Sequence, residues 1–254
     1  MAYSTDGSSH ADGIKNEKQL KEYLQKGTAR TLYPSLSESF EVIKRGGTRF
    51  KQDLEISDGD NKILISAKKK TDINDGSFDW LNSSSAMKES ESLKQFAEAV
   101  KVVGKASPPY CSAKLAVLNA SHKAIATITS EDLKSILEKH VAEKNENMKI
   151  MITETSTGKN WEYSFNESPL YHSIKSHTPG IILERGIDSA RVLFSDDNNN
   201  VLDHGLRIRV VTNNGIGALI GTSDANKTSI GVLKFQQDNI PKLIKDLGDK
   251  IRNF

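Results

Sequence analysis

The chain has 254 residues with 35 basic and 33 acidic side chains, and its net charge of +2 does not by itself indicate a nucleic-acid partner. Hydrophobic residues make up 36% and charged residues 27%, which excludes an intrinsically disordered chain. The single cysteine, Cys111, excludes a disulfide framework and a Cys-rich zinc site. No apolar run approaches the roughly 20 residues of a membrane span. We therefore expect a soluble protein of a reducing compartment, the cytoplasm.

The N-terminal region is expected to be a lead followed by a helix. Residues 1–13 are polar and have no apolar signal-peptide core, so they are interpreted as a flexible lead. Apolar residues recur at helical spacing over Ile14–Leu24, and Gly27 follows as a stop signal. Phe40–Ile43 fits either a short strand or a helix end.

A β-hairpin is the clearest element of the sequence and lies within residues 46–70. Polar and apolar residues alternate over Phe50–Ile56 and again over Lys62–Ala67. Between these segments, Ser57–Asn61 contains the Asp-Gly pair that is typical of a hairpin turn.

The rest of the chain changes from helical to strand periodicity near Met148. Helices are predicted over 87–103, over Ser130–Lys144 and over Asp238–Ile251. Period-two patterns predict strands at Met148–Thr153, Trp161–Phe165, Gly180–Leu183, Arg191–Phe194, Leu206–Thr212 and Ser229–Phe235. No Pro-, Gly- or Ser-rich linker divides the chain, so residues 1–254 are expected to form one mixed α/β domain with a β-rich C-terminal half.

An acid and an amine occur on the two strands of the hairpin. Asp53 falls on the first strand and Lys68 at the end of the second, so the turn brings both to one edge of the sheet. A hard cation such as Mg²⁺ prefers oxygen ligands, which Asp53 offers. A bound metal polarises a phosphate and activates water, and Lys68 can orient that water and offset the developing negative charge. The pair indicates metal-dependent phosphodiester hydrolysis.

The acid, the short turn and the apolar strand ending in x-x-Lys resemble the PD-(D/E)xK nuclease superfamily, which includes many type II restriction endonucleases. The resemblance makes Asp53 the first acidic ligand and places Ser66-Ala67-Lys68 on the (D/E)-x-K triplet. It implies a restriction-endonuclease-like fold, with a central mixed sheet flanked by helices. It also implies a Mg²⁺-dependent endonuclease that cuts double-stranded DNA.

The chain departs from the superfamily at Ser66, where Asp or Glu is usual and some restriction enzymes have Gln. Glu55 shares a strand face with Asp53 by two-residue spacing and is a candidate for the missing carboxylate. The carbonyl of Ala67 is a further candidate metal ligand. The neutral Ser66 weakens the expected metal site by one charge.

Further site residues come from the resemblance and from clustered basic side chains. Members of the superfamily often carry a Glu on a helix that leads into the core, a role that Glu17 matches and for which Glu41 competes. Basic residues gather before and after the hairpin and on one later strand, and they can contact phosphates. The candidate DNA-binding residues are Arg49, Lys51, Lys69, Lys70, Arg207 and Arg209.

Three alternatives stay open beside the nuclease. Asp53 and Glu55 also fit solvent-facing strand residues, with Lys68–Lys70 as a charged guard on an edge strand. The same fold with a decayed site would bind nucleic acid without cutting it, which Ser66 favours. A structural or assembly protein would need none of this geometry, and the sequence does not decide whether the protein is a homodimer.

Overall fold

The computed structural model describes residues 8–45, 52–74, 76–83, 125, 128–183, 189–211 and 232–254. Their contacts divide the chain into two compact units, each made of separate segments. Unit 1 comprises residues 1–76, 144–171 and 244–254, and unit 2 comprises residues 77–143 and 172–243. Each unit is described by itself, and the single domain expected from the sequence stays a prediction.

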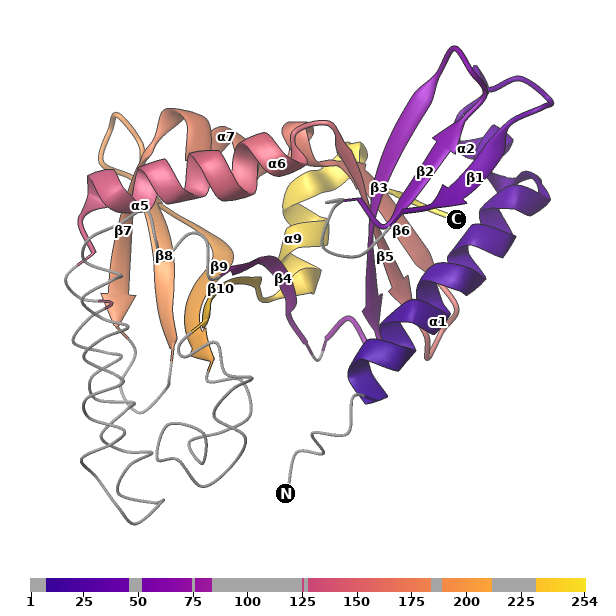
Figure 1. The fold of residues 1–254 in the computed structure, drawn as a ribbon. Coiled ribbons are helices and arrows are strands. Elements are labelled where there is room, and N and C mark those ends of the chain that lie inside the picture. Colours follow the sequence, from indigo (N-terminus) through magenta and orange to yellow (C-terminus); the bar gives the residue numbers. More distant parts are fainter. Residues whose placement is uncertain are drawn as a thin grey trace. The chain divides into compact units, whose positions relative to one another are not determined.

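Unit 1 contains a mixed sheet of strand order β1-β2-β3-β5-β6-β11. Its central strand β3 pairs antiparallel with β2 and parallel with β5, so the hairpin is one side of a larger sheet (Figure 1). The strands are β1 Glu41–Lys44, β2 Leu54–Ser57, β3 Lys62–Lys70, β5 Met148–Glu154, β6 Asn160–Ser164 and β11 Arg252–Asn253. The coarser expectation of a mixed α/β protein with a mixed sheet is confirmed.

Helix α1 (Ser8–Tyr23) packs against one face of this sheet and contacts β1 and β3. The helix continues through η1 (Leu24–Thr28) into α2 (Ala29–Leu32), and Gly27 provides the kink with φ 116°. Alternate residues of β2 and β3 face these helices because side chains alternate along a strand. The resulting core of unit 1 includes Leu20, Leu24, Leu54, Ile56, Ile65 and Met151.

Unit 2 contains an antiparallel sheet of strand order β4-β10-β9-β8-β7. Helix α5 (Ser130–Leu137) contacts the edge strand β7. Thr129 caps the N-terminus of α5, because its hydroxyl accepts a hydrogen bond from the Asp132 N–H at 3.1 Å. The strands are β4 Phe78–Ser83, β7 Thr178–Leu183, β8 Ser189–Ser195, β9 Val201–Val211 and β10 Val232–Gln237.

The remaining helices lie where the chain passes between segments of the two units. α5 continues into η3 (Glu138–Ala142) and α6 (Glu143–Asn145). The others are η4 Phe165–Glu167, α7 Pro169–Ser176, α9 Ile240–Leu247 and η6 Gly248–Lys250. None of the helices in the described part of the chain has a run long and apolar enough to cross a lipid bilayer.

Several boundaries differ from those expected. Helix α1 begins at Ser8, so part of the expected flexible lead is helical. Strand β2 begins at Leu54, so Asp53 precedes the strand on which it was expected. The predicted strands from Met148 onward all correspond to observed strands, and the strands form two sheets where one was expected. The helix predicted over 87–103 lies outside the described residues.

Helix α7 was not expected from the sequence. Pro169 occupies its first position, where proline is favoured. The Ser168 hydroxyl accepts a hydrogen bond from the Tyr171 N–H at 3.2 Å, as a helix-capping residue does. The Ser-Pro pair is therefore the local signal that would have revealed this helix.

Candidate functional site

The Asp53 carboxylate reaches across from the start of β2 to β3. Its Oδ2 accepts a hydrogen bond from the Ala67 N–H at 2.7 Å and one from the Ser66 hydroxyl at 3.4 Å. The Asp53 N–H also donates to the Ile65 carbonyl at 2.9 Å. The Asp53 side chain thus acts as a hydrogen-bond partner for β3 just before β2 begins. The structure brings together the first acid and the Ser66-Ala67-Lys68 triplet that the sequence singled out.

Oxygen atoms are available at this edge of β3 for a hard cation. In an extended strand the N–H and C=O of one residue point to the same side. The Ala67 carbonyl therefore faces the side from which the Asp53 carboxylate approaches, and the Ser66 hydroxyl lies beside that carboxylate. Among the described residues, no group of three His, Cys, Asp or Glu side chains is arranged to hold a metal. Carboxylate, carbonyl and hydroxyl oxygens are the donor types that a hard cation such as Mg²⁺ uses, together with water and substrate phosphate.

Lys68 lies on the same face of β3 as Ser66. Side chains alternate along a strand, so Ala67 and Lys69 point to the opposite face. Ala67 packs against the α1 side of the core, which places Ser66 and Lys68 on the face away from α1. Two residues along a strand span roughly 7 Å. The Cα atom of Lys68 therefore lies about that far along β3 from Ser66, the residue that contacts Asp53.

Glu55 is held in an ion cluster. It is 4% exposed and accepts hydrogen bonds from Arg45 Nε at 3.1 Å and Nη2 at 3.3 Å, while Lys62 Nζ lies 3.2 Å from it. The hydrogen bond from Arg45 keeps the pKa of the Glu55 carboxyl below its ordinary value. Glu55 is therefore charged and compensated by two cations, and the structure does not bring its carboxylate to the Asp53 carboxylate.

Sequence reasoning grouped Arg45 with other basic residues but did not identify its partnership with Glu55. That contact depends on the pairing of β1 with β2, which places Ile43 opposite Glu55. The alternation pattern gives faces within a strand but not the register between two strands.

Glu17 and Glu41 lie away from Asp53. Glu17 on α1 forms an ion pair of 2.8 Å with Lys44, which is opposite Leu54 and therefore on the α1 face. Glu41 is exposed and pairs in register with Ser57 at the turn end of the hairpin. Glu17 therefore lies on the α1 side of the sheet, while Glu41 shares the face of Ser66 but lies at the turn end of the hairpin, away from Asp53.

The candidate DNA-binding residues of the hairpin are placed in part. Arg49 and Lys51 lie outside the described residues. Lys69 and Lys70 are the last two residues of β3, and both side chains are half-buried. They therefore extend the basic end of the strand beyond Lys68.

The remaining two candidates belong to strand β9 of unit 2. Arg207 forms an ion pair of 2.5 Å with Asp238, so part of its charge is already compensated. Arg209 follows two residues later, opposite Lys234 of β10.

Comparison with known proteins found no matching family model, no matching curated protein and no matching solved structure. The function is therefore argued from the geometry around Asp53. The residues that carry the argument are Asp53, Ser66, Ala67 and Lys68, all of which lie in unit 1.

Proposed function

We propose that the chain is a metal-dependent DNA endonuclease of restriction-endonuclease-like fold, with its site at Asp53 and the Ser66–Lys68 triplet. The observation that carries the proposal is the 2.7 Å hydrogen bond from the Ala67 N–H to the Asp53 carboxylate. This contact places the acid against the triplet to which the sequence resemblance assigns the chemistry. The mixed sheet that contains the hairpin is compatible with that resemblance.

The residues can divide the work of phosphodiester hydrolysis. A divalent cation at the Asp53 carboxylate and the Ala67 carbonyl would polarise the phosphate and acidify a water molecule. The Lys68 ammonium would hold the attacking water and stabilise the charge that grows on the phosphate oxygens. The attacking water would lose a proton to solvent as its oxygen bonds to phosphorus, and the bond from phosphorus to the sugar oxygen would break, with that oxygen taking up a proton from solvent. Ser66 would orient the Asp53 carboxylate by donating a hydrogen bond to it from its hydroxyl group.

Plasmid nicking in Mg²⁺ tests the proposal directly. Asp53→Asn keeps an oxygen that can accept the Ala67 N–H but removes the charge, and Lys68→Met removes the ammonium while keeping most of the side-chain length. Each change should lower the cleavage rate by about 10²-fold or more, and EDTA should abolish cleavage by the parent protein. Asp60→Asn, an exposed position in the turn of the same hairpin, is the matched control and should cut at the parental rate. Parental rates in both site variants would refute the proposal.

A second function is favoured by the state of Glu55. Since Arg45 and Lys62 engage this carboxylate, and Ser66 is neutral, the site has one described acid where the superfamily usually has two. The same residues would then form a nucleic-acid-binding module that does not cut.

Ser66→Asp separates the two functions. The new carboxylate would lie beside Asp53, where like charges repel until a cation binds. We expect Mg²⁺ to raise the melting temperature of Ser66→Asp more than that of the parent. Cleavage by Ser66→Asp combined with DNA binding but no cleavage by the parent would support the binding module.

A further inference from the structure

A small pocket of about 240 Å³ opens between α1 and the ends of β5 and β6 in unit 1. It lies on the face of the sheet that α1 covers, opposite to Ser66 and Lys68, because Thr153 alternates with Ile152 and shares a face with Met151 of the core. The lining consists of Asn16, Gln19, Leu20, Tyr23, Thr153, Thr155 and Asn160. All but Leu20 carry a polar side-chain atom, so the pocket is suited to a ligand that forms hydrogen bonds.

Asn16 is the least expected residue of this lining. It is 4% exposed, and no hydrogen bond joins its side chain to another residue in the described part of the chain. The amide atoms of Asn16 are not among the fully buried side-chain atoms that lack a partner in the described segments, so they open into the pocket that the residue lines. The following residue on this helical face, Leu20, shows that an apolar side chain is accommodated here. The Asn16 amide is thus available to a molecule in the pocket.

Asn160 supplies a second amide. It is 8% exposed, and its Oδ1 accepts a hydrogen bond from the Thr153 hydroxyl at 2.9 Å. Its Nδ2 has no hydrogen-bond partner within the described segments. The pocket therefore offers N–H donors from two amides and an acceptor from Asn16. Asn side chains pair in this way with the donor and acceptor atoms at the edge of a nucleobase.

Tyr23 offers an aromatic surface at the mouth of the pocket. The residue is 44% exposed, and its ring stacks on Phe254 with ring centroids 6.2 Å apart and an interplanar angle of 18°. Stacking on Phe254 fixes one side of the ring and leaves exposed area on which a planar base can pack. Aromatic side chains in this position are a recurring means of holding unpaired bases.

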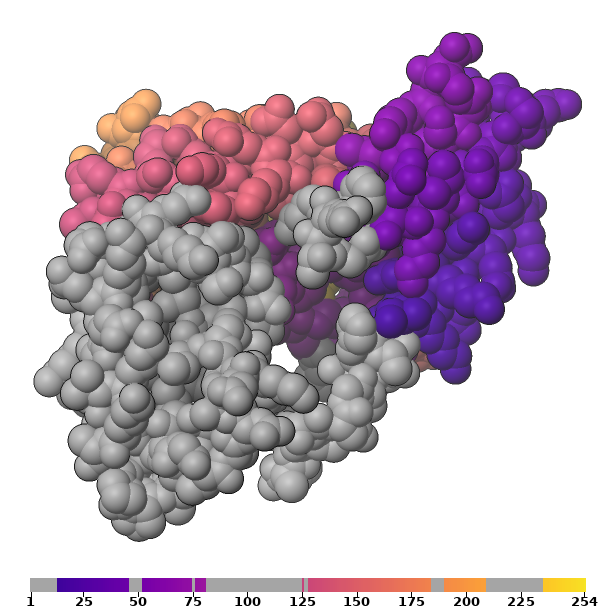
Figure 2. Space-filling view, viewed as in Figure 1, coloured from indigo at the N-terminus to yellow at the C-terminus, as the bar shows by residue number. Residues whose placement is uncertain are grey.

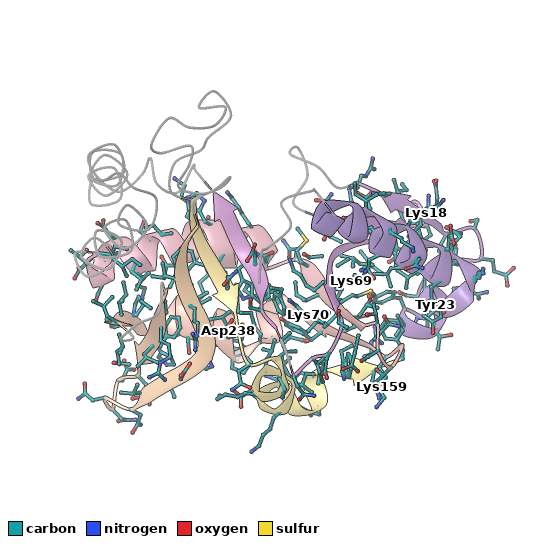
Figure 3. The ribbon with its side chains drawn as sticks, turned by 90° about the horizontal axis from the view of Figure 1, so that it is seen from below. Lys18, Tyr23, Lys69, Lys70, Lys159 and Asp238 are labelled. Atoms are coloured by element: carbon teal, nitrogen blue, oxygen red, sulfur yellow. The ribbon has the colours of Figure 1, made fainter. Side chains whose placement is uncertain are left out.

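A basic side chain lies on the pocket's face of the unit 1 sheet. Lys69 is opposite Thr153 in the β3–β5 register, and in the described segments it has no ion-pair partner. Figure 3 labels Lys18 and Tyr23 on α1, Lys69 in β3, and Lys159 just before β6. A phosphate attached to a ligand in the pocket would therefore meet positive charge.

We propose that this pocket binds the base of a nucleotide, with Asn16 and Asn160 on its edge, Tyr23 on its plane and Lys69 toward its phosphate. Only an unpaired base presents a free edge and plane, so the ligand would be a single-stranded or displaced nucleotide. The inference deepens the proposed function, because it gives a DNA-cutting protein a base contact, but it does not require cleavage.

Binding of the full-length protein to a labelled single-stranded oligonucleotide in EDTA tests this inference, with fluorescence anisotropy as the readout. Asn16→Leu should weaken binding about ten-fold without lowering the melting temperature, since it replaces an amide that has no described partner. Tyr23→Ala should weaken binding about ten-fold, and the matched Tyr23→Phe should bind like the parent. Competition by nucleoside monophosphates would identify a free nucleotide as the ligand, and binding to the oligonucleotide alone would identify a strand.

An abasic oligonucleotide of the same length distinguishes base recognition from phosphate attraction. The inference is overturned if this strand binds as tightly as the base-containing one, or if Asn16→Leu and Tyr23→Ala both bind like the parent. Base-dependent binding without any Mg²⁺-dependent cleavage would reject the endonuclease and leave the pocket in place. Mg²⁺-dependent cleavage without base-dependent binding would reject the base pocket and leave the endonuclease in place.

Discussion

At the residue scale, three carboxylates of unit 1 have different hydrogen-bond partners: those of Glu162, Glu55 and Asp53. Glu162 is 2% exposed, receives a hydrogen bond from the Tyr33 hydroxyl at 2.5 Å, and lies 3.1 Å from Arg252 Nη2 through each of its oxygens. Burial, with Glu162 beside it, raises the pKa of the Tyr33 hydroxyl well above its ordinary value. Glu55 is compensated by two cations. Asp53 differs because the contacts that hold it to β3 are an N–H and a hydroxyl of the triplet.

Neutralising Glu55 should destabilise the protein. Glu55→Gln keeps the size of the side chain but removes the negative charge that faces Arg45 and Lys62. We expect the free energy of unfolding to fall by about 1–3 kcal/mol, as for a lost hydrogen bond to a charged group, in urea denaturation at pH 7. Glu38→Gln is the matched control, because the Glu38 side chain is 89% exposed in its ion pair with Arg30, and exposed pairs contribute little. Equal effects of the two substitutions would contradict the role given to Glu55.

At the scale of elements, the turn of the β2–β3 hairpin is held by hydrogen bonds to one carboxylate, that of Asp58. Both oxygens of Asp58 accept hydrogen bonds, from the Ser37 N–H at 2.8 Å and from the Asn61 N–H at 2.7 Å. Gly59 follows with φ 98°, a conformation that suits glycine. Because Asp58 and Gly59 fix the shape of the turn, they determine which residues of the two strands face each other. Figure 2 shows the surface of α1, β1 and this hairpin in indigo to violet.

Asp58 in this turn should make the stability of the folded protein depend on pH in the acidic range. Backbone hydrogen bonds, chiefly from Ser37 and Asn61, lower the pKa of Asp58 to about 2, below the ordinary value of about 4. Because the pKa is lower in the folded protein, this group stabilises the fold above about pH 4 and loses that effect as the pH falls toward 2. Asp58→Asn should be less stable than the parent at pH 6 and should lose less stability between pH 5 and pH 2. Urea denaturation across this range measures both slopes, and parallel slopes would refute the assignment.

Two glycines with the same φ provide a matched test of packing. Gly205 and Gly158 both have φ 71°, but a Cβ at Gly205 would lie 2.5 Å from the Asp238 carbonyl oxygen, while a Cβ at Gly158 would meet no atom within 4 Å. Gly158→Ala should cost about 1–2 kcal/mol of unfolding free energy from the left-handed conformation alone. Gly205→Ala should cost about 1–3 kcal/mol more, because the strand must also shift. Equal losses in urea denaturation would show that the contact with Asp238 relaxes freely.

The elements that the sequence predicted are those that depend on neighbours in the chain. The hairpin followed from alternation around the Asp-Gly turn, and α5 followed from its acidic start at Ser130. The parallel pairing of β3 with β5 joins residues about 80 positions apart, such as Lys69 and Thr153, and no local pattern encodes it. The approach of Asp53 to the triplet was predictable because the Asp-Gly turn indicates how β2 pairs with β3. The contact of Glu55 with Arg45 depends on the β1–β2 register, and the pocket at Asn16 joins α1 to β5 and β6, so no local pattern indicates either of them.

At the scale of the whole molecule, unit 1 is completed by the end of the chain. Strand β11 pairs with β6 and places Arg252 opposite Glu162, so the last residues finish a sheet that begins at β1. Because both units are assembled from separate segments, neither can be isolated by cutting at a single point.

Truncation after Leu247 should therefore destabilise a unit that begins at the opposite terminus. The shortened chain leaves the buried Glu162 carboxylate without Arg252, whose side chain is 43% exposed, and we expect the loss of this charged hydrogen bond to cost about 1–3 kcal/mol. Arg252→Met in the full chain keeps the strand and removes only the charge, so it should account for most of that loss in urea denaturation. A truncated protein as stable as the parent would show that β11 contributes little.

The alternation of β3 has a consequence for how such a sequence can change over time. Lys68 and Lys69 are adjacent, yet one points to the Asp53 side and the other to the α1 side. Insertion or loss of one residue between Ile65 and Lys68 would exchange the two lysines and turn apolar side chains outward. Changes in length within this stretch are therefore tolerated only in steps of two, so the spacing inside the strand should be conserved more strictly than the identity of its residues.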